Sequence, residues 1–450
     1  MNAKNEKAKI TDIFTGLTIV VAFLVGHLYF PPMLYIAAIL TIALYAFNYK
    51  NIIALTVFFI PLARIMKFSP EAMTVLGIAT IISLCIMLFN NKMQLGATEL
   101  LIGVMFLILL LIKNTVGEFG FPFSYIRIAL LLVLLPQCLD YYKKGKLSFN
   151  LQATAVMAFA GICTSSLIGI IWAEDPRLTN YIATEDIYYV GVTIFNRFCG
   201  LSSDPNYFSS LVLFSTALQL TCLINTKRSI YMIYAVILSA IGILTLSKMF
   251  LLLIALTWCV SIMVIMTDKS FSVKKQSKKG KILLLFSIGI VAFAVYFVRS
   301  GYFDVIVSRF GYEGASSITT GRSDIWKAYV LEISSSIKTM FLGSATNAET
   351  VGVHVTHNTP IQILWKLGIV GVFVVLVWYV ALHIRTKRMT LAAHINPNKM
   401  TIILLLAQIL PLFALDKFFF DEFYWYYIVY LLIRMNISDS IFVFEVKEHE

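Results

Sequence analysis

A cationic and polar stretch between two apolar runs is the first part of this sequence that could do chemistry. It contains Arg197 and, shortly after it, the tripeptide Asp204-Pro205-Asn206. Asp204 or Ser203 can cap a helix, and Pro205 suits the first turn because its missing N–H has no partner to lose there. A helix N-terminus and a nearby arginine both attract anions. The stretch therefore predicts a phosphate-binding site, and the alternative is an ordinary capped helix whose arginine binds lipid headgroups.

Two histidines, His354 and His357, lie just before another apolar run, in a stretch that continues with Asn358. Two histidines can be metal ligands, but no third histidine, cysteine or carboxylate follows at a ligand spacing. A neutral imidazole at a membrane edge can instead act as a general base near neutral pH. We therefore expect a base rather than a metal centre, with a purely structural histidine as the alternative.

The elements that must position these residues are membrane helices. Of the 450 residues, 59% are hydrophobic and only 13% are charged, and the mean hydropathy is +0.84. Soluble chains are nearer half apolar and a quarter charged. Because the apolar runs are continuous rather than alternating, they favour helices over a barrel. We expect an all-α, polytopic integral membrane protein with about 12–14 transmembrane helices, forming one domain over residues 1–450.

Continuous apolar runs mark the expected spans. They cover residues 12–28, 31–47, 51–66, 72–89, 98–112, 122–139, 152–172, 206–224, 229–246, 249–266, 282–298, 359–382, 400–415 and 418–433. No small-residue cleavage site follows the first run, so we expect a retained helix rather than a signal peptide.

Basic residues gather in alternate loops, which predicts that these loops face the cytoplasm. The inner residues are then Lys50, Lys92, Lys143, Lys144, Lys146, Lys227, Arg228, Lys269, Lys274, Lys275, Lys278, Lys279, Lys281, Arg385, Lys387, Arg388, Lys399, Arg434 and Lys447. Both termini are expected inside. The net charge of +12 mostly reflects this pattern, so a nucleic-acid partner is not expected.

Two long segments, residues 173–205 and 299–358, fall on the expected outer side, and long loops in compact proteins are often functional. The large extracytoplasmic loop 299–358 contains an amphipathic pattern that predicts a helix at the outer membrane surface. Ser323 would cap this helix and Asp324 would lie in its first turn. Its apolar face would hold Ile325, Trp326, Tyr329, Val330, Ile333 and Ile337.

Several basic residues lie on the outer side, against the positive-inside bias. They are Arg197, Lys248, Arg299, Arg309, Arg322, Lys327 and Lys338. An anionic ligand at the outer leaflet would explain them, and contact with lipid headgroups is the alternative.

Five short stretches, in order along the chain, resemble the motifs of the O-antigen ligase and polymerase superfamily. They are Arg197-x-x-Gly200 with Asp204-Pro205-Asn206; Leu246-Ser247-Lys248; Thr320-Gly321-Arg322-Ser323-Asp324-Ile325-Trp326; Leu342-Gly343 with His357-Asn358; and Gly368-x-x-Gly371. The large outer loop agrees with that superfamily as well. One departure is Lys248, where the family usually has arginine; lysine keeps the charge but lacks the two-pronged donor.

The resemblance implies a fold like the glycosyltransferase C class and a metal-independent glycosyltransferase activity. The donor would be a glycan on undecaprenyl pyrophosphate, and cations would stabilise the leaving pyrophosphate. The catalytic residues would be His357 as base, with Arg197 and Lys248 as cations. The substrate-binding residues would be Arg322, Asn206, Asn358 and Asp204.

The leading interpretation is a Wzy-type polymerase that joins oligosaccharide repeat units on the outer face of the bacterial cytoplasmic membrane. It would serve an O-antigen, capsule or exopolysaccharide, beside a chain-length regulator and a flippase. The alternative is a ligase that transfers finished glycan to lipid A core or protein, and a polysaccharide flippase is a third, less favoured class. No Walker loop or G-x-G-x-x-G is present, so no nucleotide cofactor is expected.

Overall fold

The computed structural model describes residues 3–70, 72–92, 95–116, 123–172, 174–181, 187–190, 193–202, 204–267, 295, 298–299, 301, 322–344, 351, 355–390, 398–417 and 424–436. Within these residues the chain is helical apart from one hairpin, so the expected helical class is confirmed. Strands β1 (Ile187–Val190) and β2 (Thr193–Asn196) of this hairpin are antiparallel. The hairpin lies in the long segment 173–205, directly before Arg197.

The helices are as follows. They are α1 (Ala3–Leu28), α2 (Pro32–Phe47), α3 (Ile52–Phe59), α4 (Val75–Asn90), α5 (Ala97–Val116), α6 (Phe123–Leu134), α7 (Gln137–Lys143), α8 (Leu151–Ile171), α9 (Pro205–Thr226), α10 (Ile230–Ile243), α11 (Lys248–Thr267), α15 (Arg322–Ser334), α16 (Ile337–Leu342), α17 (Thr359–Thr390) and α18 (Asn398–Ile409). Short 3₁₀ turns cover Tyr49–Asn51, Ile60–Ile65 and Leu410–Phe413. Residues 424–436 form a further helix.

Several of these helices are long and apolar enough to cross a membrane. The described residues contain five of them, Thr11–Leu28, Leu151–Ile171, Pro205–Thr226, Lys248–Met266 and Thr359–Thr386. A sixth is possible if the pair Pro32–Phe47 and Tyr49–Ile65, bent by 84°, counts as one broken span. Four shorter apolar helices accompany them. The chain is therefore a multi-pass membrane protein, and the expected total of about 12–14 crossings stays a prediction.

Expected spans and observed helices differ where the backbone cannot continue a helix. The run 122–139 breaks into α6 and α7 near Pro136, because proline has no N–H to donate within a helix. The run 51–66 ends in a 3₁₀ turn that contains Pro61. The run 282–298 lies almost entirely outside the described residues.

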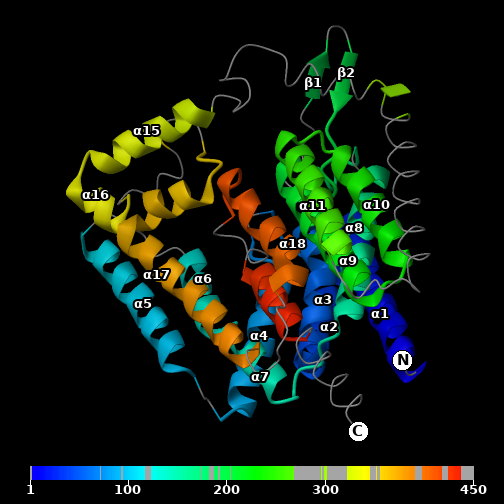
Figure 1. Ribbon diagram of the computed structural model, residues 1–450, viewed down its shortest axis with the longest axis horizontal. Coiled ribbons are helices and arrows are strands. Elements are labelled where there is room, and N and C mark those ends of the chain that lie inside the picture. Colours follow the sequence, from blue (N-terminus) through cyan, green and yellow to red (C-terminus); the bar gives the residue numbers. More distant parts are fainter. Residues whose placement is uncertain are drawn as a thin grey trace.

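Helix α9 is the centre of the bundle, packed against α8, α10, α11 and α18 (Figure 1). Its apolar and small polar residues are almost all buried. The hydroxyls of Thr216 and Thr221 donate to backbone oxygens one turn earlier, which satisfies them without water. Gln219 ties α9 to α8 by donating to the carbonyl of Ala155, 2.7 Å away.

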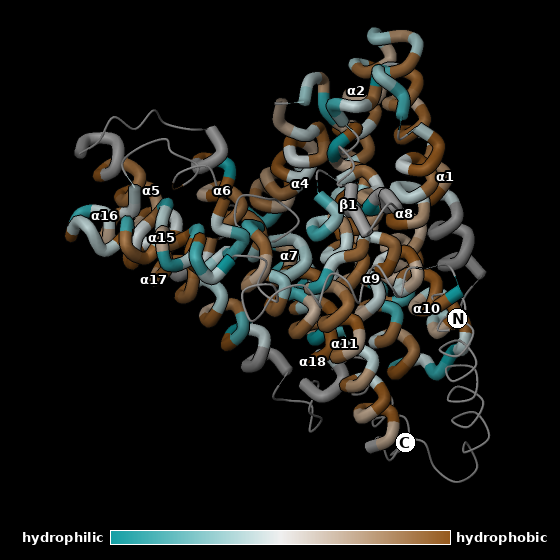
Figure 2. The backbone as a smooth tube through the Cα atoms, turned by 90° about the horizontal axis from the view of Figure 1, so that it is seen from above, coloured by the Kyte–Doolittle hydropathy of each residue, from teal (hydrophilic) through white to brown (hydrophobic). Residues whose placement is uncertain are grey.

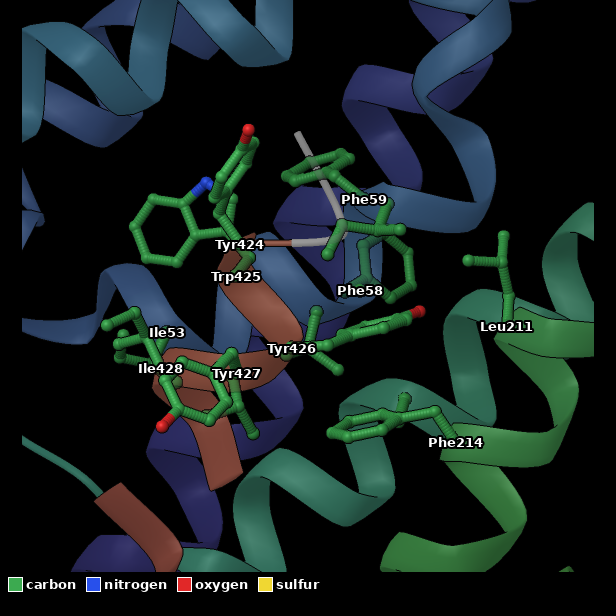
Figure 3. Packing of buried hydrophobic residues seen from close by; sticks show 14 of the residues in the cluster. Ile53, Phe58, Phe59, Leu211, Phe214, Tyr424, Trp425, Tyr426, Tyr427 and Ile428 are labelled. Atoms are coloured by element: carbon green, nitrogen blue, oxygen red, sulfur yellow. The ribbon is translucent and has the colours of Figure 1, made fainter. Parts of the chain in front are cut away.

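The last described helix, residues 424–436, packs its aromatic side chains between α3 and α9 (Figure 3). Phe214 of α9 stacks on Tyr426, with ring centroids 4.1 Å apart. Phe58 and Phe59 of α3 lie beside Tyr424 in the same cluster (Figure 3). This core joins distant parts of the chain into one body.

Polar contacts join one set of loops at one end of the bundle. Arg177 donates to the carbonyl of Leu28 at 2.7 Å and lies over the ring of Tyr29. Arg64 donates to the carbonyl of Asn180 at 3.4 Å. All of these residues belong to, or adjoin, segments that the basic-residue pattern predicts to lie outside.

A second set of contacts joins the loops that are predicted to lie inside. Lys144 donates to Asn91 at 2.5 Å, and the N–H of Ser148 donates to the carbonyl of Lys50 at 2.8 Å. Arg385 of α17 forms ion pairs with Glu99 of α5 and with Asp140 of α7. Loops that are predicted to share a side thus contact one another, and both the alternation of the loops and the side that faces the cytoplasm stay predictions from the basic residues.

Helices α5, α15, α16 and α17 lie to one side of the molecule, away from α1 and α8–α11 (Figures 1 and 2). Figure 2 shows hydrophobic residues along most of the helices, as a lipid-facing protein requires.

Two glycines with positive φ, Gly343 at 81° and Gly368 at 66°, let α16 meet α17 closely. A Cβ on Gly343 would lie 2.5 Å from the backbone carbon of Lys366. Helix α17 is kinked at Gly368, where its backbone is not helical.

Helix α15 lies within the segment 299–358, where a helix was expected, and differs from that expectation in two respects. It begins at Arg322, so Ser323 lies in its first turn and is not its cap. Tyr329 and Ile333 pack against Trp365 of α17, whereas Val330 and Ile337 are exposed rather than part of the buried face. Burial raises the pKa of Tyr329, whose hydroxyl accepts the N–H of Val351. The apolar face therefore contacts α17.

Candidate functional site

Arg197 is buried, with 4% of its surface exposed, and joins three elements. Its Nε donates to the carbonyl of Thr245 at 3.0 Å, in the turn between α10 and α11. Its Nη2 donates to Oδ1 of Asn206 at 3.2 Å, in the first turn of α9. A guanidinium carries five N–H donors in one plane, and these two bonds set the plane of this one.

The start of α9 matches its expected cap. The carboxylate of Asp204 accepts the N–H groups of Asn206 at 2.6 Å and Tyr207 at 3.3 Å, and Pro205 occupies the first turn. Asp204 therefore has a clear role in the fold, as a helix cap. The structure also gives a reason for glycine at position 200. Its φ is +54°, and a Cβ there would lie 2.5 Å from the ring of Phe208.

Lys248 begins α11, directly after the turn that contacts Arg197. In this turn Leu246 has a positive φ of 52°, and the hydroxyl of Ser247 accepts the N–H of Phe250 at 3.3 Å. The N–H of Phe198 donates to the carbonyl of Leu244 at 3.1 Å. These bonds place the start of α11, where half-buried Lys248 lies, beside the stretch that carries Arg197.

The segment from Phe413 to Lys417, at the end of α18, connects the remaining parts of the site. The carboxylate of Asp416 accepts the N–H of His357 at 2.9 Å and the N–H of Asn358 at 2.8 Å, and it also accepts the hydroxyl of Thr356. The backbone carbonyl of Asp416 accepts the hydroxyl of Tyr207 at 2.5 Å. The start of α9 and the His357 turn are thus held by one buried residue.

Asn358 acts in the fold as the residue before α17. Its Oδ1 accepts the N–H of Ile361 at 3.1 Å, which is the geometry of a helix cap, and its Nδ2 donates to the carbonyl of Phe413 at 3.2 Å. The hydroxyl of the next residue, Thr359, donates to the carbonyl of Leu415. These bonds favour a structural role for Asn358 over the expected contact with substrate.

Arg322, at the start of α15, reaches the same segment. Its Nη1 donates to the carbonyl of Ala414 at 3.1 Å. One turn later, Nε1 of Trp326 donates to the carbonyl of Thr356 at 2.8 Å. The part of the large loop that resembles the family motif is therefore attached to the His357 turn.

Lys417 adds a cation that sequence reasoning did not single out. It is buried, and its Nζ donates to the hydroxyl of Ser210, one turn along α9 from Asn206. Asp416 was missed as well. The available signal was an Asp-Lys pair at the end of an apolar run, where charged residues are rare and usually functional.

The other expected cations do not join this group in the described part of the chain. Lys327 forms an exposed ion pair with Asp324 at 3.5 Å, and Lys338 and Arg299 are exposed. For these three residues contact with solvent or headgroups is the better interpretation. Arg309 and His354 lie outside the described residues.

The assembled group combines cations with carboxylates that are already bound. Arg197, Arg322 and Lys417 are bound to the adjoining segments of this group, and Lys248 begins the helix after the turn that binds Arg197. Asp204 and Asp416 accept backbone N–H groups. Among the described residues, no group of three or more His, Cys, Asp or Glu side chains could hold a metal ion. Such a group can bind an anion and, through His357, exchange a proton.

The chain matches no model of a known protein family, and no curated protein matches its sequence.

Proposed function

We propose that this chain is an integral-membrane glycosyltransferase that joins undecaprenyl-pyrophosphate-linked repeat units into a surface polysaccharide. One observation carries the proposal. The stretches around Arg197, Lys248, Arg322 and His357 resemble motifs of the O-antigen ligase and polymerase superfamily, and they meet at one end of the bundle. Their meeting is what a shared site requires, since motifs with separate structural roles could lie anywhere.

In the proposed reaction the hydroxyl of an acceptor sugar attacks the anomeric carbon of the donor glycan. The bond between that carbon and the pyrophosphate oxygen breaks, and the lipid pyrophosphate leaves with the bonding electrons. His357 takes the proton of the attacking hydroxyl. Arg197, Lys248 and Arg322 stabilise the charge that grows on the pyrophosphate. The energy of the glycosyl pyrophosphate drives the reaction, so no nucleotide is needed.

We also propose that the protein lies in the cytoplasmic membrane of a bacterium and that its site faces the outer side of this membrane. Support for the sidedness comes from the basic residues of the opposite loops, such as Lys50 and Lys144. The same proposal includes a glycosyltransferase-C-like fold. It also includes about 12–14 membrane crossings, a number that a chain of this length can supply.

A ligase is the second candidate, because the same motifs serve both activities. Purified protein in liposomes with a lipid-linked repeat unit separates the candidates. A ladder of products indicates a polymerase, and a single transfer to a lipid A core or protein acceptor indicates a ligase. Movement of the glycan lipid across the bilayer without a new bond indicates a flippase and would refute both transferase proposals.

Substitutions at Arg197 test the site. Arg197→Ala should reduce polymer formation by ~10²–10³, since that is the typical loss for one preorganised stabiliser of developing charge. Arg197→Lys should keep part of the activity, because a point charge replaces a two-pronged donor. Lys327→Ala is the matched control, an exposed cation outside the group. Equal ladders from Arg197→Ala and Lys327→Ala, at matched amounts of folded protein, would refute the assignment.

Substitutions at the histidines test the base. His357→Ala should reduce the rate by ~10²–10⁴, the usual worth of general-base help. His354→Ala should have a mild effect, because only His357 adjoins Asn358 as the family pattern requires. A larger defect at His354 than at His357 would contradict the proposed base.

A further inference from the structure

The turn that contains His357 is built around a carboxylate from another part of the chain. Asp416 is buried, and its two oxygens accept the N–H of His357 at 2.9 Å, the N–H of Asn358 at 2.8 Å and the hydroxyl of Thr356. Two successive N–H groups that point at one anion form the arrangement known as a nest. In this nest the anion is a side chain of the protein itself.

The backbone of the turn depends on that anion. His357 has a φ of 47°, in the left-handed region that residues with a Cβ rarely adopt. Such a conformation persists only where the surroundings hold it. The two N–H bonds to Asp416 are contacts of this kind, because they require the N–H groups of His357 and Asn358 to point the same way.

The same segment also holds the other parts of the site. The carbonyl of Asp416 accepts the hydroxyl of Tyr207, at the start of α9, and the carbonyl of Ala414 accepts Nη1 of Arg322. These two acceptors are main-chain carbonyls, whereas the carboxylate of Asp416 binds residues 356–358, so a substitution of the Asp416 side chain acts first on the histidine side of the site.

We propose that Asp416 is a positioning residue, which holds His357 in its left-handed conformation and so sets the backbone from which the imidazole projects. The turn is not itself a phosphate site, because its N–H groups already bind the carboxylate. The inference rests on the proposed function only where activity is measured.

The first test reports on the turn and needs no activity. Nε1 of Trp326 donates to the carbonyl of Thr356, so a 5-fluorotryptophan label at this position senses the turn by ¹⁹F NMR. Trp326→Phe assigns the signal. Asp416→Asn replaces one acceptor oxygen by a donor and should shift or broaden the signal. Asp140→Asn, a matched change at the other end of the bundle, should leave it in place. An unchanged signal in Asp416→Asn would overturn the proposal.

The second test asks whether Asp416 acts through His357. Asp416→Asn should lower polymer formation by at least ~10-fold, and the double variant with His357→Ala should be no slower than His357→Ala alone. If the losses of the two single variants multiply in the double variant, Asp416 does not act through His357, and the proposal is overturned. If the protein makes no polymer at all, the proposed function fails while the NMR test still decides the role of Asp416.

A third variant covers the case in which Asp416→Asn does not fold. Glycine adopts positive φ readily, so His357→Gly removes the backbone strain that the bonds to Asp416 offset. Asp416→Asn combined with His357→Gly should then recover the yield of folded protein in detergent. A double variant that folds no better than Asp416→Asn would show that Asp416 has some other structural role.

Discussion

Replacement of Gly368 by alanine should destabilise the protein strongly, because the kink of α17 leaves no room for a side chain. Gly368 has φ 66° and ψ −173°, a combination that is essentially restricted to glycine and costs other residues about 1–3 kcal/mol. A Cβ at this position would also overlap the carbonyl of Phe341 and lie 2.5 Å from the backbone nitrogen of Leu342.

The overlap adds to the backbone strain. Both neighbours are backbone atoms of α16, so they cannot turn away as the end of a side chain could. Inserting a methyl group into such a contact typically costs a further 1–3 kcal/mol or so. Together the two effects predict a loss of about 2–6 kcal/mol in the free energy of unfolding.

A matched control separates the two effects. Gly145 has a similar φ of +65°, but nothing lies within 4 Å of a Cβ placed there. Gly145→Ala should therefore cost only about 1–2 kcal/mol. Gly343→Ala should resemble Gly368→Ala, because Gly343 meets α17 at the same crossing.

The apparent midpoint of thermal unfolding in detergent, measured for all three variants at the same heating rate, checks this prediction. The midpoint should fall clearly further for Gly368→Ala and Gly343→Ala than for Gly145→Ala. If Gly368→Ala and Gly145→Ala have the same midpoint, then the backbone of α16 does not lie against Gly368 of α17. The position of α15, and with it Arg322, would then also be in question.

Three further predictions concern topology, metal and the other end of the bundle. In a background without the native cysteines, an impermeant thiol reagent applied to intact cells should label Ser335→Cys and not Ser148→Cys; the reverse pattern would contradict the predicted orientation. Polymer formation should survive EDTA, and a loss that a divalent ion restores would rule out the proposed metal-independent mechanism. Arg385→Ala should cost about 1–3 kcal/mol of stability, because it removes a partner of the buried carboxylate of Glu99 and of the partly buried carboxylate of Asp140. Lys327→Ala, in an exposed pair, should cost under about 1 kcal/mol, and equal unfolding midpoints for these two variants would contradict the partly buried network.

The sequence by itself determined the helical membrane class and the positions of many helices. A bilayer requires long apolar runs whose backbone bonds are satisfied locally, so both features can be read from consecutive residues. The predicted run 12–28 ends where α1 ends, and 152–172 differs from α8 by one residue at each end. The cap at Asp204 was equally predictable, because it joins residues only two and three positions apart.

Only the tertiary structure decided which residues share a site. Asp416 meets His357 across 59 positions and Arg197 meets Thr245 across 48, and no local pattern encodes such pairs. It also decided that Asn358 caps a helix. The physical reason is that a helix in a membrane is specified by its own residues, whereas the packing of one helix on another depends on side chains from both. The residues that hold a site together therefore become visible only when the helices have been assembled.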